Sequence, residues 1–277
     1  MTLLAGVIGW PVAQSRSPLI HRHWMREHGV DGDYLAMPVR PEMLGAALRG
    51  LAALGFAGCN VTVPHKEHAA RAMGRLDDTA RRMGAVNLVV VEADGSLSGF
   101  NTDGAGFLAN LRGANAGWRP QSGPALVVGA GGAARSIVAS LLDAGVPAIR
   151  LANRTAERAR RLADDFGLRV EVVEWERRAL AADGAALLVN TTSQGMAGQP
   201  ALDLRLDALP RDAVVCDIVY NPLVPPLLAA ARARGNPTVD GLGMLLHQAR
   251  PAFAAWFDIE PEVTPALRRL IEATLPG

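Results

Sequence analysis

Short apolar runs that suit β-strands alternate with helical patterns along almost the whole chain. The first half contains LLAGVIG, YLAMPV and CNVTV, and the second half contains PALVV, AIRLAN, VEVVEW, ALLVNTT and AVVCDIV. A strand that is followed by a helix and then by a further strand favours a parallel sheet with crossover helices. The sequence therefore predicts an α/β fold.

The strand–helix pattern falls into two series. The segment GANAGWRPQSG, residues 113–123, gathers Gly, Asn, Pro and Ser and interrupts the pattern. The chain has 277 residues, which exceeds the usual size of one domain, so we expect two. An Asp94-Gly95 turn between two strand-like runs predicts an antiparallel hairpin at the edge of the first sheet. Two helices should follow residue 240, with a kink or break in the first of them at Pro251.

Composition excludes several classes of protein. Lys and Arg number 28 against 27 Asp and Glu, so no basic field for nucleic acid exists, and no apolar run is long enough to cross a membrane. The start, MTLLAGVIGWP, is interpreted as a first strand and not as a signal peptide. Cys59 and Cys216 are expected to be buried free thiols, and His21, His23 and His28 are expected on the surface of one helix. We predict a cytoplasmic, metal-free protein.

The segment ALVVGAGGAARS combines an apolar strand, a glycine turn and the start of a helix. Gly129, Gly131 and Ala134 occupy the three positions of the pattern G-x-G-x-x-G/A. The first glycine permits the tight turn, the second lets the backbone approach a pyrophosphate, and the third position needs a small residue for packing. Because the N–H groups of a helix start attract anions, this segment predicts a dinucleotide site.

The strand AIRLAN and the residues after it indicate which dinucleotide binds. Asn153 stands where an NAD site usually has an acid for the ribose 2′-hydroxyl. Arg154 and Arg158 are placed to meet a 2′-phosphate, and Thr155 could add a hydroxyl while capping the next helix. A solvated basic helix start is the alternative, but cations at that end oppose the helix dipole. The sequence therefore favours NADP over NAD.

Two serines precede the first predicted helix in GWPVAQSRSPLIH. Ser17, directly before Pro18, is explained completely by helix capping, whereas Ser15 has no such explanation. Two hydroxyls just before a helix N-terminus could also form a neutral cradle for a carboxylate.

The segment NVTVPHK ends a predicted strand on a lysine. Lys66 is either the solvated start of the next helix or a cationic donor held at the carboxyl end of the strand. Asn60 and Thr62 should leave the same face of that strand. Asn87 could merely terminate its strand, and Asp103 could merely cap a helix that starts at Gly104. A polyhydroxylated substrate, however, needs several convergent polar groups that are unpaired when the site is empty, and this set supplies them.

Nine motifs follow one another across nearly the whole chain: GWPVAQSRSPLIH, NVTVPHK, AVN, FNTDG, VVGAGGAAR, NRT, NTTSQGM, DIVYNP and DGLGMLLHQA. By their number, order and spacing the chain resembles the shikimate dehydrogenase family. That family reduces 3-dehydroshikimate to shikimate with NADPH in aromatic amino-acid biosynthesis. The resemblance implies a substrate domain with a mostly parallel sheet over residues 1–103, a Rossmann-type NADP-binding domain over 104–241, and C-terminal helices over 242–277 that return to the first domain.

The resemblance also implies roles for the residues at matching positions. Ser15 and Ser17 would hold the substrate carboxylate, and Lys66 would be the catalytic acid/base, paired with Asp103. The substrate ring would be bound by Asn60, Thr62, Asn87, Asp103, Tyr220 and Gln248. The pyrophosphate of NADP would contact Gly129, Ala130, Gly131, Gly132 and Ala133. The adenosine phosphate would contact Asn153, Arg154, Thr155 and Arg158. The nicotinamide would contact Met196, Gly243 and Met244.

Two alternatives stay open at this point. A quinate/shikimate dehydrogenase of the same fold could use NAD, although Arg154 and Arg158 argue against NAD. A dinucleotide-sensing module without turnover would have little use for Lys66, Asp103 and the paired serines together. We expect a monomer or a homodimer.

Overall fold

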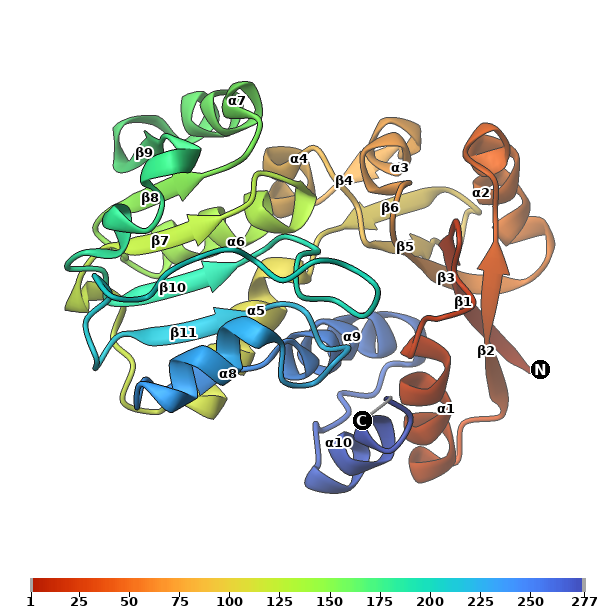
Figure 1. The fold of residues 1–277 in the computed structure, drawn as a ribbon. Coiled ribbons are helices and arrows are strands. Elements are labelled where there is room, and N and C mark those ends of the chain that lie inside the picture. The colour runs from red at the N-terminus through yellow and green to blue at the C-terminus, as the bar shows by residue number, and fades with distance from the viewer. Residues whose placement is uncertain (1, 276–277) are drawn as a thin grey trace. The chain divides into compact units, whose positions relative to one another are not determined.

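The computed structural model describes residues 2–275 and contains two six-stranded sheets (Figure 1). The chain forms two compact units. Unit 1 holds the described residues up to Thr102 together with Gln248–Ile271, and unit 2 holds Asp103–His247 together with the described residues from Glu272 on. The predicted α/β class is confirmed, because each sheet is built from strands that alternate with helices.

The sheet of unit 1 has the order β2-β1-β3-β5-β6-β4. Its strands are β1 (Leu3–Gly9), β2 (Gly32–Pro38), β3 (Phe56–Val61), β4 (Arg75–Leu76), β5 (Leu88–Val91) and β6 (Leu97–Phe100). The strand β1 is parallel to β2 and β3, and β5 is antiparallel to β3 and β6. The predicted hairpin is present as β5 and β6, but the short strand β4 pairs with β6. The sequence predicted that the hairpin forms the edge of the sheet. This prediction is wrong, because β4 lies outside β6.

The helices of unit 1 are α1 (Ser17–His28), α2 (Leu44–Ala53), α3 (Lys66–Ala72), α4 (Asp78–Met83), the second part of α9 (Gly241–Phe257) and most of α10 (Pro265–Glu272), with a 3-10 turn, η1, at Pro41–Met43. Gly29 ends α1 in the left-handed conformation with φ 65, as expected. The helix α9 runs on through Pro251, so of the kink or break expected there, the break does not occur. Ala252 and Phe253, the two residues after the proline, are fully buried, and this packing holds the helix together across the missing hydrogen bond.

The sheet of unit 2 has the order β12-β11-β10-β7-β8-β9, and all its pairs are parallel. Its strands are β7 (Ala125–Val128), β8 (Ile149–Ala152), β9 (Val170–Val173), β10 (Leu187–Asn190), β11 (Val214–Asp217) and β12 (Thr238–Val239). The strand β12 was not predicted, because it is only two residues long. The helices are α5 (Asp103–Ala114), α6 (Gly132–Asp143), α7 (Ala156–Phe166), α8 (Pro226–Ala233) and the start of α9, with 3-10 turns η2 to η5 at Pro120–Ser122, Gly167–Arg169, Trp175–Arg177 and Leu180–Ala182.

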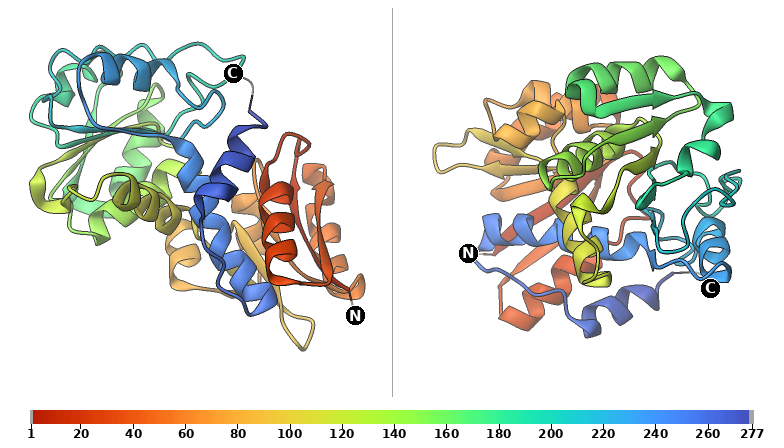
Figure 2. Two further views of the ribbon diagram at one scale, coloured as in Figure 1. Left: turned by 90° about the horizontal axis from the view of Figure 1, so that it is seen from below. Right: turned by 90° about the vertical axis from the view of Figure 1, so that its left-hand side faces the viewer.

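Both faces of this second sheet are covered (Figure 2). Val127 points into a core shared with α5, α6 and α7, whereas its neighbours Leu126 and Val128 point into a core shared with α8. Side chains alternate between the faces of a strand, so burial on both faces explains the continuous apolar run in β7. This is the doubly wound arrangement expected of a Rossmann-type unit.

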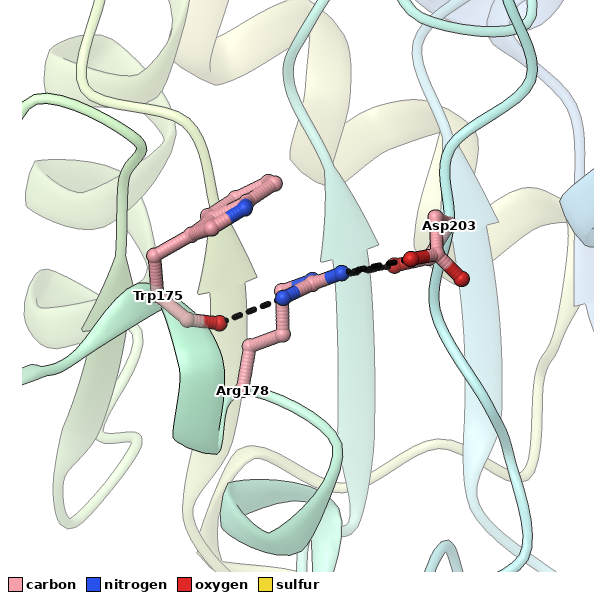
Figure 3. A network of polar contacts seen from close by, with 3 residues as sticks. All are labelled: Trp175, Arg178 and Asp203. Carbon is pink, nitrogen blue, oxygen red and sulfur yellow. Dashed lines mark hydrogen bonds and ion pairs between the residues drawn. The ribbon is translucent and has the colours of Figure 1, made fainter.

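An extended segment of unit 2, residues 201–206, has no helix or strand of its own. Arg178 holds it in place: its guanidinium stacks on Trp175 at 4.2 Å and donates from Nε to the Asp203 carbonyl at 2.9 Å (Figure 3). The guanidinium also donates to the Trp175 carbonyl at 2.6 Å and to the Asp203 carboxylate at 3.1 Å. Leu202 and Leu206 of the segment are thereby kept in the core beneath it.

The predicted domain limits at 103/104 and 241/242 remain predictions. The two units differ from them at α9, since residues 241–247 belong to unit 2 and the helix continues into unit 1. The interruption predicted at residues 113–123 lies inside unit 2, where it covers the end of α5 and most of the connection to β7.

Candidate functional site

Three predicted substrate-binding residues form one amide cluster in unit 1. Asn60 lies in β3, Asn87 directly precedes β5, and Gln248 lies in α9. The Asn60 Nδ2 donates to the Asn87 carbonyl at 3.0 Å, and the Asn87 Nδ2 donates to Gln248 Oε1 at 3.2 Å. The fold therefore brings together residues that are far apart in the sequence.

Thr102 completes this amide cluster, although no sequence signal had selected it. Its hydroxyl accepts from the Asn87 Nδ2 at 2.9 Å and donates to the Gln248 carbonyl at 2.9 Å, and its backbone N–H donates to Asn87 Oδ1 at 2.9 Å. The expectation that these amides are unpaired is thus wrong. Buried amides without partners are costly, so the fold pairs Asn60 and Asn87 within the protein and fixes their orientation in advance.

Tyr34 and His21 lie behind the cluster, and both roles were missed. The Tyr34 hydroxyl donates to Asn60 Oδ1 at 2.7 Å. The imidazole of His21 is stacked on the Tyr34 ring, with centroids 4.1 Å apart and an angle of 1° between the planes. His21 is fully buried, which contradicts its expected place on the surface of α1, because that face of the helix packs against Tyr34 of β2 and Phe253 of α9.

The surroundings of His21 disfavour its protonation. Neither ring nitrogen has a hydrogen-bond partner among residues 2–275. Burial lowers the pKa of His21 to about 3, and the nearby Asn60 side chain offsets part of that effect. The neutral imidazole therefore behaves as an aromatic core side chain.

The capping expected of Ser17 at the start of α1 is not present. The N-cap of α1 is Arg16, and no side chain caps the helix there, so Ser17 is not the cap. Instead the Ser15 hydroxyl accepts a hydrogen bond from the Ser17 backbone N–H at 3.3 Å. The helix begins one residue earlier than the capping interpretation required, which places Ser17 inside its first turn. Ser15 is half-buried and Ser17 is buried.

Lys66 is the first residue of α3, and its side chain is half-buried. The strand predicted over residues 60–63 ends at Val61, although the Thr62 N–H still donates to the Ile8 carbonyl of β1 at 2.9 Å. The Lys66 carbonyl accepts from the Val86 N–H at 2.9 Å, one residue before Asn87. The backbone thus fixes Lys66 at the carboxyl end of β3, next to the segment that carries Asn87.

The glycine turn of unit 2 connects β7 to α6 and has room for a ligand. Gly129 has φ 114, and a Cβ there would collide with Thr191, so only glycine fits. A Cβ added to Gly131 or Gly132 would meet no atom within 4 Å, so open space lies in front of the helix N-terminus. Ala134 is fully buried, as close packing of helix and strand requires, and Ala130 and Ala133 are half-buried beside the turn. These features fit a pyrophosphate held by backbone N–H groups.

Two exposed arginines follow β8: Arg154 precedes α7 and Arg158 lies in the first turn of α7. Arg154 and Arg158 form no ion pair with any residue of the described part of the chain, whereas Arg161 of the same helix pairs with Glu157 at 3.3 Å. Asn153 donates to the Thr155 carbonyl at 2.8 Å. Thr155 is the N-cap of α7, but its side chain forms no capping hydrogen bond, contrary to expectation. Uncompensated cations at a helix start fit a 2′-phosphate.

The residues expected near the nicotinamide are more varied. Met196 is 40% exposed and follows β10, and Tyr220 is half-buried and follows β11. Met244 is 9% exposed and belongs to the core, while a Cβ on Gly243 would collide with Asn110 of α5. Packing between α9 and α5 is thus enough to explain the glycine.

Asp103 is the first residue of α5 and is buried, so the helix starts at Asp103 and not at Gly104.

Cys59 and Cys216 are buried free thiols, as predicted, and burial raises the pKa of both. Within residues 2–275, no three His, Cys, Asp or Glu side chains gather as metal ligands would, and no helix is long and apolar enough to cross a membrane.

Comparison with known proteins gives consistent matches over both units. Residues 7–89 match the family model described as shikimate dehydrogenase substrate binding domain, and residues 118–197 match the one described as shikimate / quinate 5-dehydrogenase. The shikimate dehydrogenase (NADP(+)) of Paramagnetospirillum magneticum is 59% identical over 97% of this chain and 97% of its own length.

Solved structures show the same relationship. Shikimate 5-dehydrogenase of Thermus thermophilus, in complex with NADP(H) and shikimate, has a TM-score of 0.87 at 37% identity and covers 99% of both chains. Quinate dehydrogenase of Corynebacterium glutamicum, in complex with NAD, has a TM-score of 0.91 at 30% identity and covers 98% of this chain and 99% of its own. From its motifs, its two units and these relatives, the chain belongs to the shikimate dehydrogenase family.

Proposed function

We propose that this protein catalyses the reversible reduction of 3-dehydroshikimate to shikimate with NADPH, a step of aromatic amino-acid biosynthesis. The amide cluster of Asn60, Asn87 and Gln248 carries this proposal. These amides are already oriented by internal hydrogen bonds, so a ring with several hydroxyls meets polar groups whose orientation is fixed in advance. The relationship to NADP-dependent shikimate dehydrogenases supports the same substrate.

The proposed chemistry divides between a cofactor and the protein. Bound NADPH supplies the hydride that reduces the ring carbonyl. Lys66 donates a proton or a hydrogen bond to the oxygen that becomes negative, and takes the proton back in the oxidation direction. Asp103 is the proposed partner of Lys66. Ser15 and Ser17 hold the carboxylate of the substrate, while Thr62 and Tyr220 complete the proposed contacts of the ring.

Arg154 and Arg158 support NADP as the preferred dinucleotide, since both are exposed cations without an acidic partner in the described chain. The pyrophosphate lies on the backbone of residues 129–133 in this proposal, and Asn153 and Thr155 assist at the phosphate end. Met196, Gly243 and Met244 are proposed at the nicotinamide end.

The proposal extends to the setting of the enzyme. We place it in the cytoplasm, as a monomer or homodimer without nucleic-acid or membrane partners. The two buried free thiols are consistent with a reducing compartment.

The decisive assay follows NADPH consumption with 3-dehydroshikimate and the reduction of NADP or NAD with shikimate and with quinate. We expect turnover of 3-dehydroshikimate and shikimate with a preference for NADP. A preference for quinate and NAD would assign the protein to the other activity known among its structural relatives. No turnover of any of the three compounds would refute the proposal.

The role of Lys66 is tested by Lys66→Ala. General acid–base catalysis contributes on the order of 10²–10⁴ in rate, so kcat should fall by that factor while the KM for shikimate changes less. Asp103→Asn keeps the size of the side chain, and a large loss of kcat would indicate that its charge matters. A folded Lys66→Ala variant with normal kcat would show that Lys66 is an ordinary solvated lysine without a catalytic role.

A further inference from the structure

A buried carboxylate of unit 2 connects two loops outside the sheet. Asn190 ends β10 and Asp217 ends β11, and the two residues are register partners in neighbouring parallel strands. Both side chains are buried, with Asp217 2% and Asn190 0% exposed. The Asn190 Nδ2 donates to Asp217 Oδ2 at 3.0 Å.

Each member of this pair also holds the loop that follows its own strand. Asp217 Oδ1 accepts from the Val219 N–H at 2.9 Å. Asn190 donates to the Gln194 carbonyl at 3.1 Å and accepts at Oδ1 from the Thr192 N–H at 3.0 Å and from its hydroxyl at 2.8 Å. The pair therefore fixes the loops after β10 and β11 relative to each other.

A further hydrogen bond, from the Ala197 N–H to the Asn221 carbonyl at 2.8 Å, joins the same two loops farther out. The loop after β10 carries Met196 and the loop after β11 carries Tyr220. Their arrangement therefore depends on the Asn190–Asp217 pair at the base.

A carboxylate is an expensive choice for this position. Asp217 has no salt bridge with a residue of the described chain, and burial raises its pKa to about 6, opposed in part by the hydrogen bonds from Asn190 and Val219. A buried acid that only filled space could be replaced by an apolar residue at little cost. Two separate donors, the Asn190 amide at the end of β10 and the Val219 N–H in the loop after β11, are however each met by a different oxygen, and a carboxylate provides both.

The strand order shows which part of a dinucleotide these loops would meet. The glycine turn follows β7, and the arginines proposed for the 2′-phosphate follow β8 on one side of it. The strands β10 and β11 lie on the other side of β7. Ligands of doubly wound sheets bind outside the carboxyl ends of the strands, so the second nucleotide extends over β10 and β11.

We propose that Asp217, acting through Asn190, is a positioning residue that sets the loops after β10 and β11 for the nicotinamide half of NADPH, and has no part in binding the adenosine half. This inference rests on the proposed NADPH-dependent function. It predicts that a change at Asp217 weakens binding of the nicotinamide half and leaves binding of the adenosine half unchanged. A purely structural role would not produce this difference.

The test is Asp217→Asn, which keeps the shape but leaves one oxygen for two donors. We expect the affinity for NADPH, measured by calorimetry, to fall about tenfold or more, because a charge-assisted hydrogen bond is lost. The affinity for 2′,5′-ADP, which represents the adenosine half alone, should stay within about twofold. The matched control is Asp212→Asn, at an exposed aspartate before β11, and it should change neither affinity.

Equal weakening of NADPH and 2′,5′-ADP by Asp217→Asn would overturn the inference, and so would no weakening of either. If Asp217→Asn does not fold, Thr192→Val carries the test, since it removes the hydroxyl that bonds Asn190 from a half-buried loop position. It should show the same separation, and a uniform loss would overturn the inference again. A wild-type protein that neither binds NADPH nor reduces 3-dehydroshikimate would instead refute the proposed function.

Discussion

Replacing the buried His21 by Phe should make the protein markedly less sensitive to acid. Its imidazole lies flat on Tyr34 and has no hydrogen-bond partner within residues 2–275, so a phenyl ring can take its place in the aromatic cluster. In the unfolded chain the same histidine titrates with a pKa near 6.5, whereas burial lowers the pKa of His21 in the folded protein to about 3. Below pH 6.5 protons therefore bind the unfolded state preferentially, and stability falls as the pH falls.

The magnitude follows from the two pKa values. One proton taken up on unfolding changes the free energy of unfolding by about 1.4 kcal/mol per pH unit. Between pH 8 and pH 5, His21 should cost the wild-type protein about 2 kcal/mol, and the loss should reach about 4 kcal/mol at pH 3. At pH 8 the Phe variant should be within about 1.5 kcal/mol of the wild type, since the exchange nearly conserves volume.

Urea unfolding at pH 8 and pH 5, followed by tryptophan fluorescence, measures this difference. Trp24 and Trp256 lie 5.7 and 5.5 Å from the His21 ring and report on unit 1. Asp217 acts in the opposite direction, because its pKa is raised to about 6 and acid therefore favours its folded state, but wild type and variant share that contribution. The control is His68→Gln, at an exposed position of α3, which should keep the acid sensitivity. A Phe variant that loses as much stability as the wild type would refute the reasoning.

Three further variants test other parts of the structure. Arg154→Ala should weaken NADP binding about tenfold or more and NAD binding much less, because NAD lacks the 2′-phosphate. Arg161→Ala is the matched control. Equal losses for both dinucleotides in Arg154→Ala would indicate that Arg154 has a packing role. Ser15→Ala should lower the free energy of unfolding by about 0.5–1 kcal/mol and raise the KM for shikimate. Ser17→Ala should raise the KM for shikimate without the loss of stability expected of a helix cap. The reverse pattern would indicate that Ser17 caps the helix after all. Arg178→Ala should cost about 2 kcal/mol of stability in urea unfolding with an unchanged KM for shikimate, and a stable variant would show that the segment 201–206 holds itself in place.

Local patterns in the sequence predicted much of the fold. The strands and helices of both units follow from hydrophobic periodicity, and the Asp94-Gly95 turn predicted the β5–β6 hairpin. The glycine turn after β7 was also predicted from the sequence. Gly129 has a positive φ and lies beside Thr191, so only glycine fits there. Patterns of this kind act over a few residues, so one sequence is enough to recognise them. Features with few residues, such as β4 and β12, left no such pattern and were missed.

Local sequence patterns were thus enough to predict the α/β class, the dinucleotide turn and the basic residues that favour NADP. Only the folded chain shows which polar groups pair, that His21 is buried, and that Ser17 does not cap α1. Whether an amide is paired depends on partners that are close in space but remote in the chain, as in the bonds from Asn87 to Thr102 and Gln248. Burial likewise depends on how a helix face packs against a sheet. No pattern of neighbouring residues encodes that contact, so the environment of each functional side chain becomes visible only once the chain is folded.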